Sequence, residues 1–126
     1  MQAIHTDDAP QAVGPYSQAV VAGNVVYASG QIGLDPKTME FVADEVTAQA
    51  RQALANLKAV LEQAGSGMGH VVKAQVWLLT MDDFAAVNAV YAEAFGDHRP
   101  ARACVAVSEL PKGGRVEIDA IALIPG

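Results

Sequence analysis

The segment Gln18-Ala19-Val20-Val21-Ala22-Gly23-Asn24-Val25-Val26-Tyr27-Ala28-Ser29 contains two apolar runs separated by a Gly-Asn dipeptide. Two β-leaning runs around a two-residue turn of this type are typical of a β-hairpin. Gly30 follows at once, and a glycine at this place predicts that the second strand ends or bends. The segment therefore predicts a sheet, and the rest of the chain must supply what covers it.

Two amphipathic helices are predicted after the loop Leu34-Asp35-Pro36-Lys37-Thr38. In residues 46–64 the apolar side chains recur at steps of three and four, and Gly65 is a suitable stop. The second helix is predicted after Thr80-Met81-Asp82-Asp83, which resembles a capping box with Asp in place of Glu, and before Gly96. Its apolar face consists of Phe84, Val87, Tyr91 and Phe95.

Three further strands are predicted, over residues 71–79, 101–107 and 115–124, and a short extra strand near Ala3-Ile4 is an option. The order is strand-strand-helix-strand-helix-strand-strand, which indicates an α+β fold with a mixed sheet. Two helices cannot cover both faces of such a sheet, so we expect both on one face. The other face is rich in Ala and Val, and association with further copies of the chain would bury it. The sequence therefore predicts a homo-oligomer.

Composition limits the function. The 126 residues fit one domain over residues 1–126, with 52% hydrophobic and 17% charged residues. The net charge of −6 and the scattered Lys and Arg residues argue against nucleic acid as the main partner. No apolar run is long enough for a membrane span, and the first residues do not resemble a signal peptide. With a single cysteine, Cys104, these features predict a cytoplasmic protein.

Charged residues stand on two of the predicted strands. Because side chains alternate along a strand, Arg102 shares one face with Cys104 and Ala106, and Ala103, Val105 and Val107 are expected to form the core face. On the last strand, Glu117 and Asp119 point away from the apolar positions. One interpretation is a structural ion pair across neighbouring strands, or a solvated face. The other is an arginine that binds a substrate carboxylate through both prongs of its guanidinium, beside a glutamate that moves protons.

The remaining candidates are weaker. Gly14-Pro15 is explained as a turn, and Tyr16 fits either simple packing or a site hydroxyl. Cys104 is typical of a small buried hydrophobic residue rather than a nucleophile. The three histidines lack metal-ligand spacing, so no metal is expected.

Five segments in the same order resemble the Rid (reactive intermediate deaminase) family, also called the YjgF or endoribonuclease L-PSP family. They are Gly14-Pro15-Tyr16-Ser17-Gln18-Ala19, Ala28-Ser29-Gly30-Gln31-Ile32, Pro100-Ala101-Arg102-Ala103-Cys104-Val105, Leu110-Pro111-Lys112 and Val116-Glu117-Ile118-Asp119-Ala120-Ile121-Ala122. The resemblance covers essentially the whole chain. It implies a fold similar to chorismate mutase of the trimeric type, with three sheets facing a common centre, helices outside, and ligand sites between subunits.

The resemblance also implies an activity without a cofactor, the hydrolysis of 2-aminoacrylate or 2-iminobutyrate to the 2-keto acid and ammonia. Arg102 would hold the substrate carboxylate, and Glu117 would activate the water and move protons. Tyr16 and Ser29 would line the pocket, and Gly30 would let backbone groups approach the imine. Cys104 would form part of the pocket wall, and Asn88 would support the site from behind.

This sequence departs from the family pattern at two places. The connection from Phe95 to Pro100 is shorter than in the best-known members and contains Arg99 where many have an apolar residue, and Asp119 stands where glutamate is common. The first departure concerns substrate side-chain preference. The alternative to an enzyme is a trimer that binds small carboxylates or acts as a chaperone without turnover.

Overall fold

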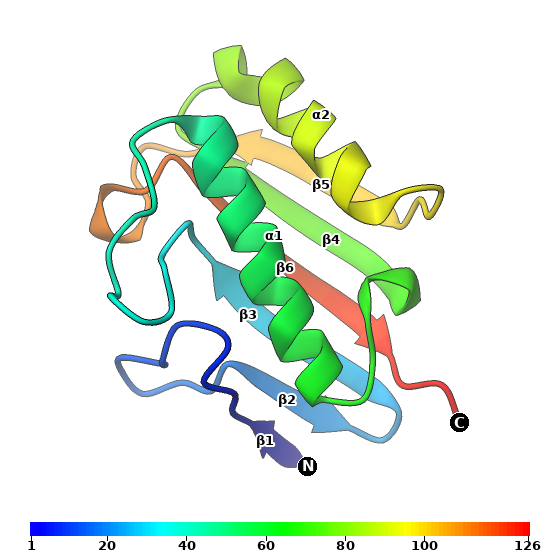
Figure 1. Cartoon of the computed structure of the whole chain (residues 1–126). Helices are drawn as coiled ribbons and strands as arrows, with labels where there is room; N and C mark the ends of the chain where they lie inside the picture. Colours follow the sequence, from blue (N-terminus) through cyan, green and yellow to red (C-terminus); the bar gives the residue numbers. More distant parts are fainter.

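The structure is a computed structural model that describes residues Met1–Gly126. One sheet contains all six strands, and two α-helices complete the fold (Figure 1). Along the chain the elements are β1 (Gln2–Ile4), β2 (Ala19–Ala22), β3 (Val25–Gln31), α1 (Val46–Gln63), β4 (Val71–Leu78), α2 (Phe84–Phe95), β5 (Ala101–Ala106) and β6 (Val116–Leu123). The predicted order of strands and helices is confirmed, and the optional first strand is present as β1.

In space the strands lie in the order β1-β2-β3-β6-β4-β5. All neighbours are antiparallel except β4 and β5, which are joined through α2 and run parallel. The predicted hairpin is β2 and β3, which are connected by Gly23 and Asn24. The sheet is therefore mixed, as predicted.

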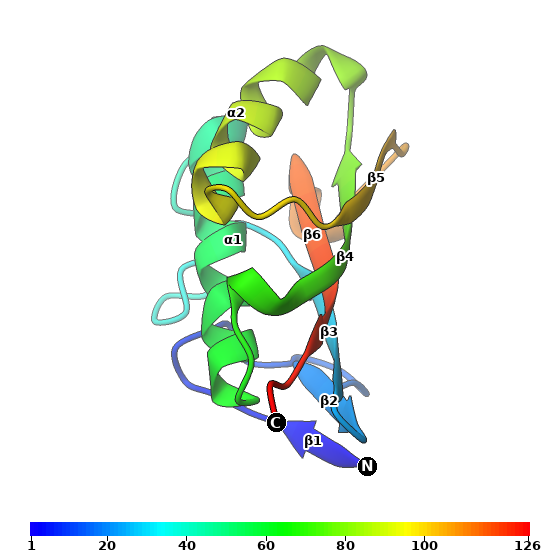
Figure 2. The same ribbon diagram turned by 90° about the vertical axis from the view of Figure 1, so that its right-hand side faces the viewer.

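Both helices cover the same face of the sheet, and the opposite face carries none (Figure 2). The core lies between the two layers. Alternate residues of β6 point into it, and Val116, Ile118 and Ala122 are fully buried there. From the helix side, Leu57 and Leu61 of α1 are also fully buried, and each such leucine stabilises the fold by about 1.5–3 kcal/mol.

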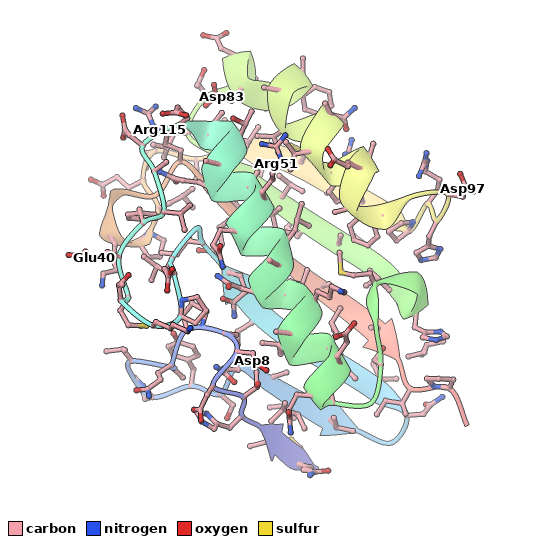
Figure 3. The ribbon with its side chains drawn as sticks, viewed as in Figure 1. Asp8, Glu40, Arg51, Asp83, Asp97 and Arg115 are labelled. Carbon is pink, nitrogen blue, oxygen red and sulfur yellow. The ribbon has the colours of Figure 1, made fainter.

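Gln49 connects α1 to the start of β6. Its Oε1 atom accepts a hydrogen bond from the backbone N–H of Arg115 at 2.9 Å, and its Nε2 donates to the carbonyl of Ala43 at 3.0 Å. The Arg115 guanidinium, close to the first turn of α1 in Figure 3, forms an ion pair with Asp44 at 3.3 Å. These bonds fix the beginning of β6, which carries Glu117.

The helix ends agree with the sequence prediction except at the beginning of α2. Gly65 and Gly96, which follow α1 and α2, have φ angles of +87° and +61° that favour glycine. Before α2, the Thr80 hydroxyl accepts a hydrogen bond from the Asp82 N–H at 3.1 Å. Asp83 makes no capping bond in return, and a short 3₁₀ turn precedes the helix. The predicted capping box is therefore only half formed, because the short Asp83 side chain sits inside the 3₁₀ turn.

The predicted core face of β5 is wrong. Ala103 and Val105 lie on the face without helices, and Val105 is 41% exposed, whereas Cys104 packs against the core. The error arose because β5 is an edge strand whose apolar side faces away from α2, while Arg102 points toward that helix. The open face is partly apolar and includes the exposed Tyr27 and Leu123.

A β-bulge interrupts β3 where the sequence predicts a bend. Ala28 pairs with Ala120 and Gln31 pairs with Ile118, so β3 has one more residue in this interval than β6. The extra residue lies in Ser29-Gly30, opposite the part of β6 that carries Glu117.

Neither helix of the structure is long and apolar enough to cross a membrane.

Candidate active site

A cavity of about 630 Å³ lies beside the bulge of β3. We call it the glutamate pocket. Its walls come from the loop before β2, from the bulge, from the loop after β3 and from the segment before β6. They include Tyr16, Ser29, Gly30, Ile32, Pro111, Lys112 and Glu117. The structure thus brings together four of the residues predicted for the site, namely Tyr16, Ser29, Gly30 and Glu117.

The glutamate carboxyl group lies directly against Gly30. A Cβ atom added to Gly30 would lie 2.2 Å from Oε2 of Glu117 and 2.7 Å from its carboxyl carbon. Gly30 is therefore required for space rather than for an unusual φ angle. It allows the carboxyl group to lie against the backbone of β3.

Glu117 has an altered proton affinity. Burial raises the pKa of its carboxyl group, and the nearby Asp119 carboxylate raises it further. Asp119 itself accepts a hydrogen bond from Nε1 of Trp77 at 3.1 Å, which keeps that carboxylate in place on the open face. A glutamate with a raised pKa exchanges protons more readily near neutral pH, which suits a general acid or base.

Two polar side chains, one partly buried and one fully buried, hold the other walls. The Ser29 hydroxyl donates to the carbonyl of Ser17 at 2.6 Å, so it secures the loop that contains Tyr16. Gln18 is 2% exposed and binds the loop before it: its Oε1 accepts from the Thr6 N–H at 2.7 Å, and its Nε2 donates to the Pro10 carbonyl at 2.8 Å. Tyr16 remains 55% exposed at the rim of the pocket.

The predicted arginine occupies a second place, which we call the arginine site. It consists of Arg102 with Phe84, Asn88, Tyr91 and Cys104. The Arg102 Nη1 atom donates to Oδ1 of Asn88 at 2.6 Å, and its guanidinium carbon lies over the Tyr91 ring at 4.8 Å from the centroid. The Phe84 ring is 5.6 Å away. No acidic side chain forms an ion pair with Arg102, so the cross-strand ion pair that was one of the two interpretations of the strand pattern is absent.

Cys104 borders the arginine site from β5. Burial raises the pKa of its thiol, and the positive charge of Arg102 opposes this shift only in part. The thiol therefore stays protonated at neutral pH, which is unsuitable for a nucleophile. No group of three His, Cys, Asp or Glu side chains is arranged to hold a metal ion.

Within one chain the two sites are separate. Arg102 is level with Ala74 and Ala120, which face the helices, whereas Glu117 is level with Trp77 on the open face. Strand β4 lies between β5 and β6 and separates these strands by roughly 10 Å. The two residues are also offset by three positions along the strands, which adds roughly 10 Å in that direction. Since the two side chains also point to opposite faces of the sheet, they cannot contact the same small ligand inside one chain.

The structure adds residues that the sequence did not indicate. Tyr91 and Phe84 were expected only as core residues of α2, yet both lie against Arg102. A signal was present, because Phe84, Asn88 and Tyr91 follow the i, i+4, i+7 spacing of one helix face, with a polar residue in an apolar stripe. Lys112 at the glutamate pocket has a left-handed backbone, with φ of 58°, which no local pattern predicted.

The fold and the two sites define a class: small α+β proteins with one uncovered sheet face and, beside a bulged strand, a cavity that contains a glutamate. The chain belongs to the endoribonuclease L-PSP family, whose sequence profile matches residues 6–124. The resemblance to the Rid or YjgF family is thereby confirmed.

Relatives match along nearly their entire length. RutC family protein PH0854 of Pyrococcus horikoshii is 51% identical over 121 residues, which cover 96% of each chain. The 2-iminobutanoate/2-iminopropanoate deaminase of Salmonella typhimurium is 50% identical over 123 residues, which cover 95% of each chain. Among solved structures, RidA from the Antarctic bacterium Psychrobacter sp. is 51% identical, with a TM-score of 0.95 and coverage of 98% of this chain and 100% of that one.

Proposed function

We propose that the protein is a deaminase that hydrolyses the enamine 2-aminoacrylate or the imine 2-iminobutyrate to the corresponding 2-keto acid and ammonia. The observation that carries the proposal is the environment of Arg102, whose guanidinium is held only by neutral groups. Four of its five N–H donors have no acceptor in the chain. A carboxylate ligand supplies two acceptors in the matching geometry. The name of the Salmonella relative points to the same class of substrate.

Glu117 is the group proposed to move protons. With a pKa raised by burial, its carboxylate accepts a proton from water as the oxygen attacks the imine carbon. The new C–O bond forms while the C=N electron pair moves to nitrogen. The protonated Glu117 then returns its proton to that nitrogen, which gives the neutral carbinolamine. Glu117 next takes the proton of the new hydroxyl group and passes it to the nitrogen, so the C–N bond breaks and ammonia leaves as the carbonyl forms. For the enamine 2-aminoacrylate, a proton from water is first added to the terminal carbon and the nitrogen gives up one proton, which yields the corresponding imine.

The substrate carboxylate and the reacting carbon are a few bonds apart, so Arg102 and Glu117 must approach each other. Since one chain holds them on opposite sheet faces, we propose that the arginine site of one subunit meets the glutamate pocket of the next in a homotrimer. The open sheet face, with Tyr27 and Val105 exposed, would be buried in the centre of that assembly.

The experiment is a coupled assay in which threonine dehydratase generates 2-iminobutyrate and semicarbazide traps it. Wild-type protein is expected to divert the flux from semicarbazone to 2-ketobutyrate, and Arg102→Ala is expected to abolish most of this effect. Arg51→Ala is the matched control, because this exposed arginine of α1 lines the groove between α1 and α2 and neither of the two sites, so the variant should retain full activity. If wild type has no effect, the protein is instead a binding or chaperone-like trimer.

A mixing experiment tests whether the site is shared. Arg102→Ala and Glu117→Gln subunits are each expected to be inactive alone. When they are denatured and refolded together, random assembly gives about a quarter of the sites an intact arginine and an intact glutamate. Recovery of about that share of wild-type activity supports a shared site. Absence of recovery in mixed trimers, detected by mass spectrometry, would contradict it.

A further inference from the structure

Three residues on one face of α2 hold a single charged side chain of β5. Phe84, Asn88 and Tyr91 lie at positions i, i+4 and i+7 and therefore line up along the helix. All three contact Arg102, two through their rings and one through a hydrogen bond of 2.6 Å. This face of α2 thus does more than cover the sheet.

The two kinds of contact leave the arginine free to bind an anion. An aromatic ring interacts with the flat face of a guanidinium, whereas carboxylates bind along its edge. Asn88 uses one donor of that edge. Because none of the three side chains carries a charge, none neutralises Arg102 or competes with a ligand.

Tyr91 is the more firmly held of the two rings. It is 6% exposed, its ring packs on Phe95 at 4.5 Å between centroids, and it is nearer to Arg102 than Phe84 is. Its hydroxyl is buried without a hydrogen-bond partner, and burial raises its pKa. The hydroxyl gives no bond that would explain the position of the ring, so the contact with Arg102 depends on the ring face.

We propose that Tyr91 is a positioning residue whose ring sets the plane of the Arg102 guanidinium for a carboxylate ligand. The part that concerns a carboxylate rests on the function proposed above. The part that concerns the arginine does not, and the two are measured separately.

The arginine is observed by ¹⁵N–¹H NMR of its Nε–Hε group, assigned from the signal lost in Arg102→Lys. Protons above an aromatic ring are shifted upfield, so wild type and Tyr91→Phe are expected to show an upfield Arg102 signal. In Tyr91→Leu the signal should move downfield toward the position of a solvent-exposed arginine, although the more distant Phe84 ring remains. A wild-type signal already at the solvent-exposed position would overturn the proposal without any variant.

The ligand is observed by calorimetric titration with 2-oxobutanoate and by KM in the coupled assay. Tyr91→Leu is expected to raise both Kd and KM about tenfold and to leave kcat within about twofold. The reason is that a misplaced Arg102 guanidinium weakens the binding of the substrate and of the transition state equally. Tyr91→Phe should match wild type. Val90→Ala is the matched control: Val90 is the neighbour of Tyr91 on α2, is only 4% exposed, and lines the groove between α1 and α2 rather than the arginine site.

The outcomes are distinct. Equal losses in Tyr91→Phe and Tyr91→Leu would assign the effect to the hydroxyl and overturn the proposal. Equal losses in Val90→Ala and Tyr91→Leu would indicate general packing and would overturn it as well. If wild type binds 2-oxobutanoate without deaminase activity and Tyr91→Leu loses that binding, the deaminase proposal fails and the positioning role stands. If wild type is an active deaminase and Tyr91→Leu keeps its KM, the positioning role fails alone.

Discussion

Replacing Gly30 by alanine is expected to remove activity while leaving the fold intact. The added Cβ would lie 2.2 Å from Oε2 of Glu117, where ordinary contact begins at 3.4 Å. The carboxyl group must therefore retreat by the difference, about 1.2 Å. A displacement of about 1 Å in a reacting group costs on the order of 100-fold in rate, so kcat should fall by about that factor.

The stability of Gly30→Ala should change little. The three atoms nearest to the new Cβ all belong to the Glu117 side chain, which can rotate aside toward the cavity. We expect a change in the free energy of unfolding below about 1 kcal/mol, since alanine also loses less backbone freedom on folding than glycine.

Gly33→Ala is the matched comparison, because the same atom added three residues later meets backbone. Its Cβ would lie 2.5 Å from the Cα atom of Gln49 and 2.8 Å from the carbonyl oxygen of that residue. Neither atom can move without shifting α1, so the variant should lose about 1–3 kcal/mol of stability. Thermal unfolding and the semicarbazone assay, run on both variants, separate the two effects. Full kcat in Gly30→Ala, or a destabilisation equal to that of Gly33→Ala, would refute the reasoning.

Two further changes test the charged groups. Arg102→Lys should recover less than about a tenth of wild-type kcat/KM in the coupled assay, because an ammonium group cannot bind a carboxylate with two parallel hydrogen bonds. A wild-type value of kcat/KM in this variant would refute bidentate binding of the carboxylate. Glu117→Gln should alter the pH dependence of stability. The folded-state pKa of Glu117 is raised, so the wild-type carboxyl group destabilises the fold increasingly as pH rises from the unfolded-state pKa through the folded-state pKa. The Tm of Glu117→Gln relative to wild type should therefore be higher at pH 7.5 than at pH 4, and an equal Tm difference at both values, measured by calorimetry, would contradict a raised pKa.

The elements of the fold were predictable because each has a local signature. The 3.6-residue repeat over 46–64 predicted α1, and two apolar runs around Gly23-Asn24 predicted the hairpin. Which face of β5 points to the core was harder to predict, because a short strand of small residues has similar side chains on both faces. Only the partner of each face decides which side is core, and that partner is α2, which lies earlier in the chain.

The candidate site was predicted as a set of residues but not as an arrangement. Alternation along β6 placed Glu117 on the correct face, because Val116 and Ile118 are clearly apolar. The distance from Glu117 to Arg102 was not predictable, because it depends on β4 lying between β5 and β6. The interaction of Tyr91 with Arg102 depends on how α2 crosses the sheet, which no local pattern specifies.

The bulge in β3 makes the cavity depend on chain length as well as on residue identity. Ala28 and Gln31 are an odd number of positions apart, yet both pair with residues of β6 that face the helices. Deleting one residue at Ser29-Gly30 would turn everything after it to the opposite face. Insertions and deletions at the bulge are therefore excluded. The Gly23-Asn24 turn at the other end of the same strand is an exposed loop tip, where a change of length leaves the pairing of β3 with β6 in place.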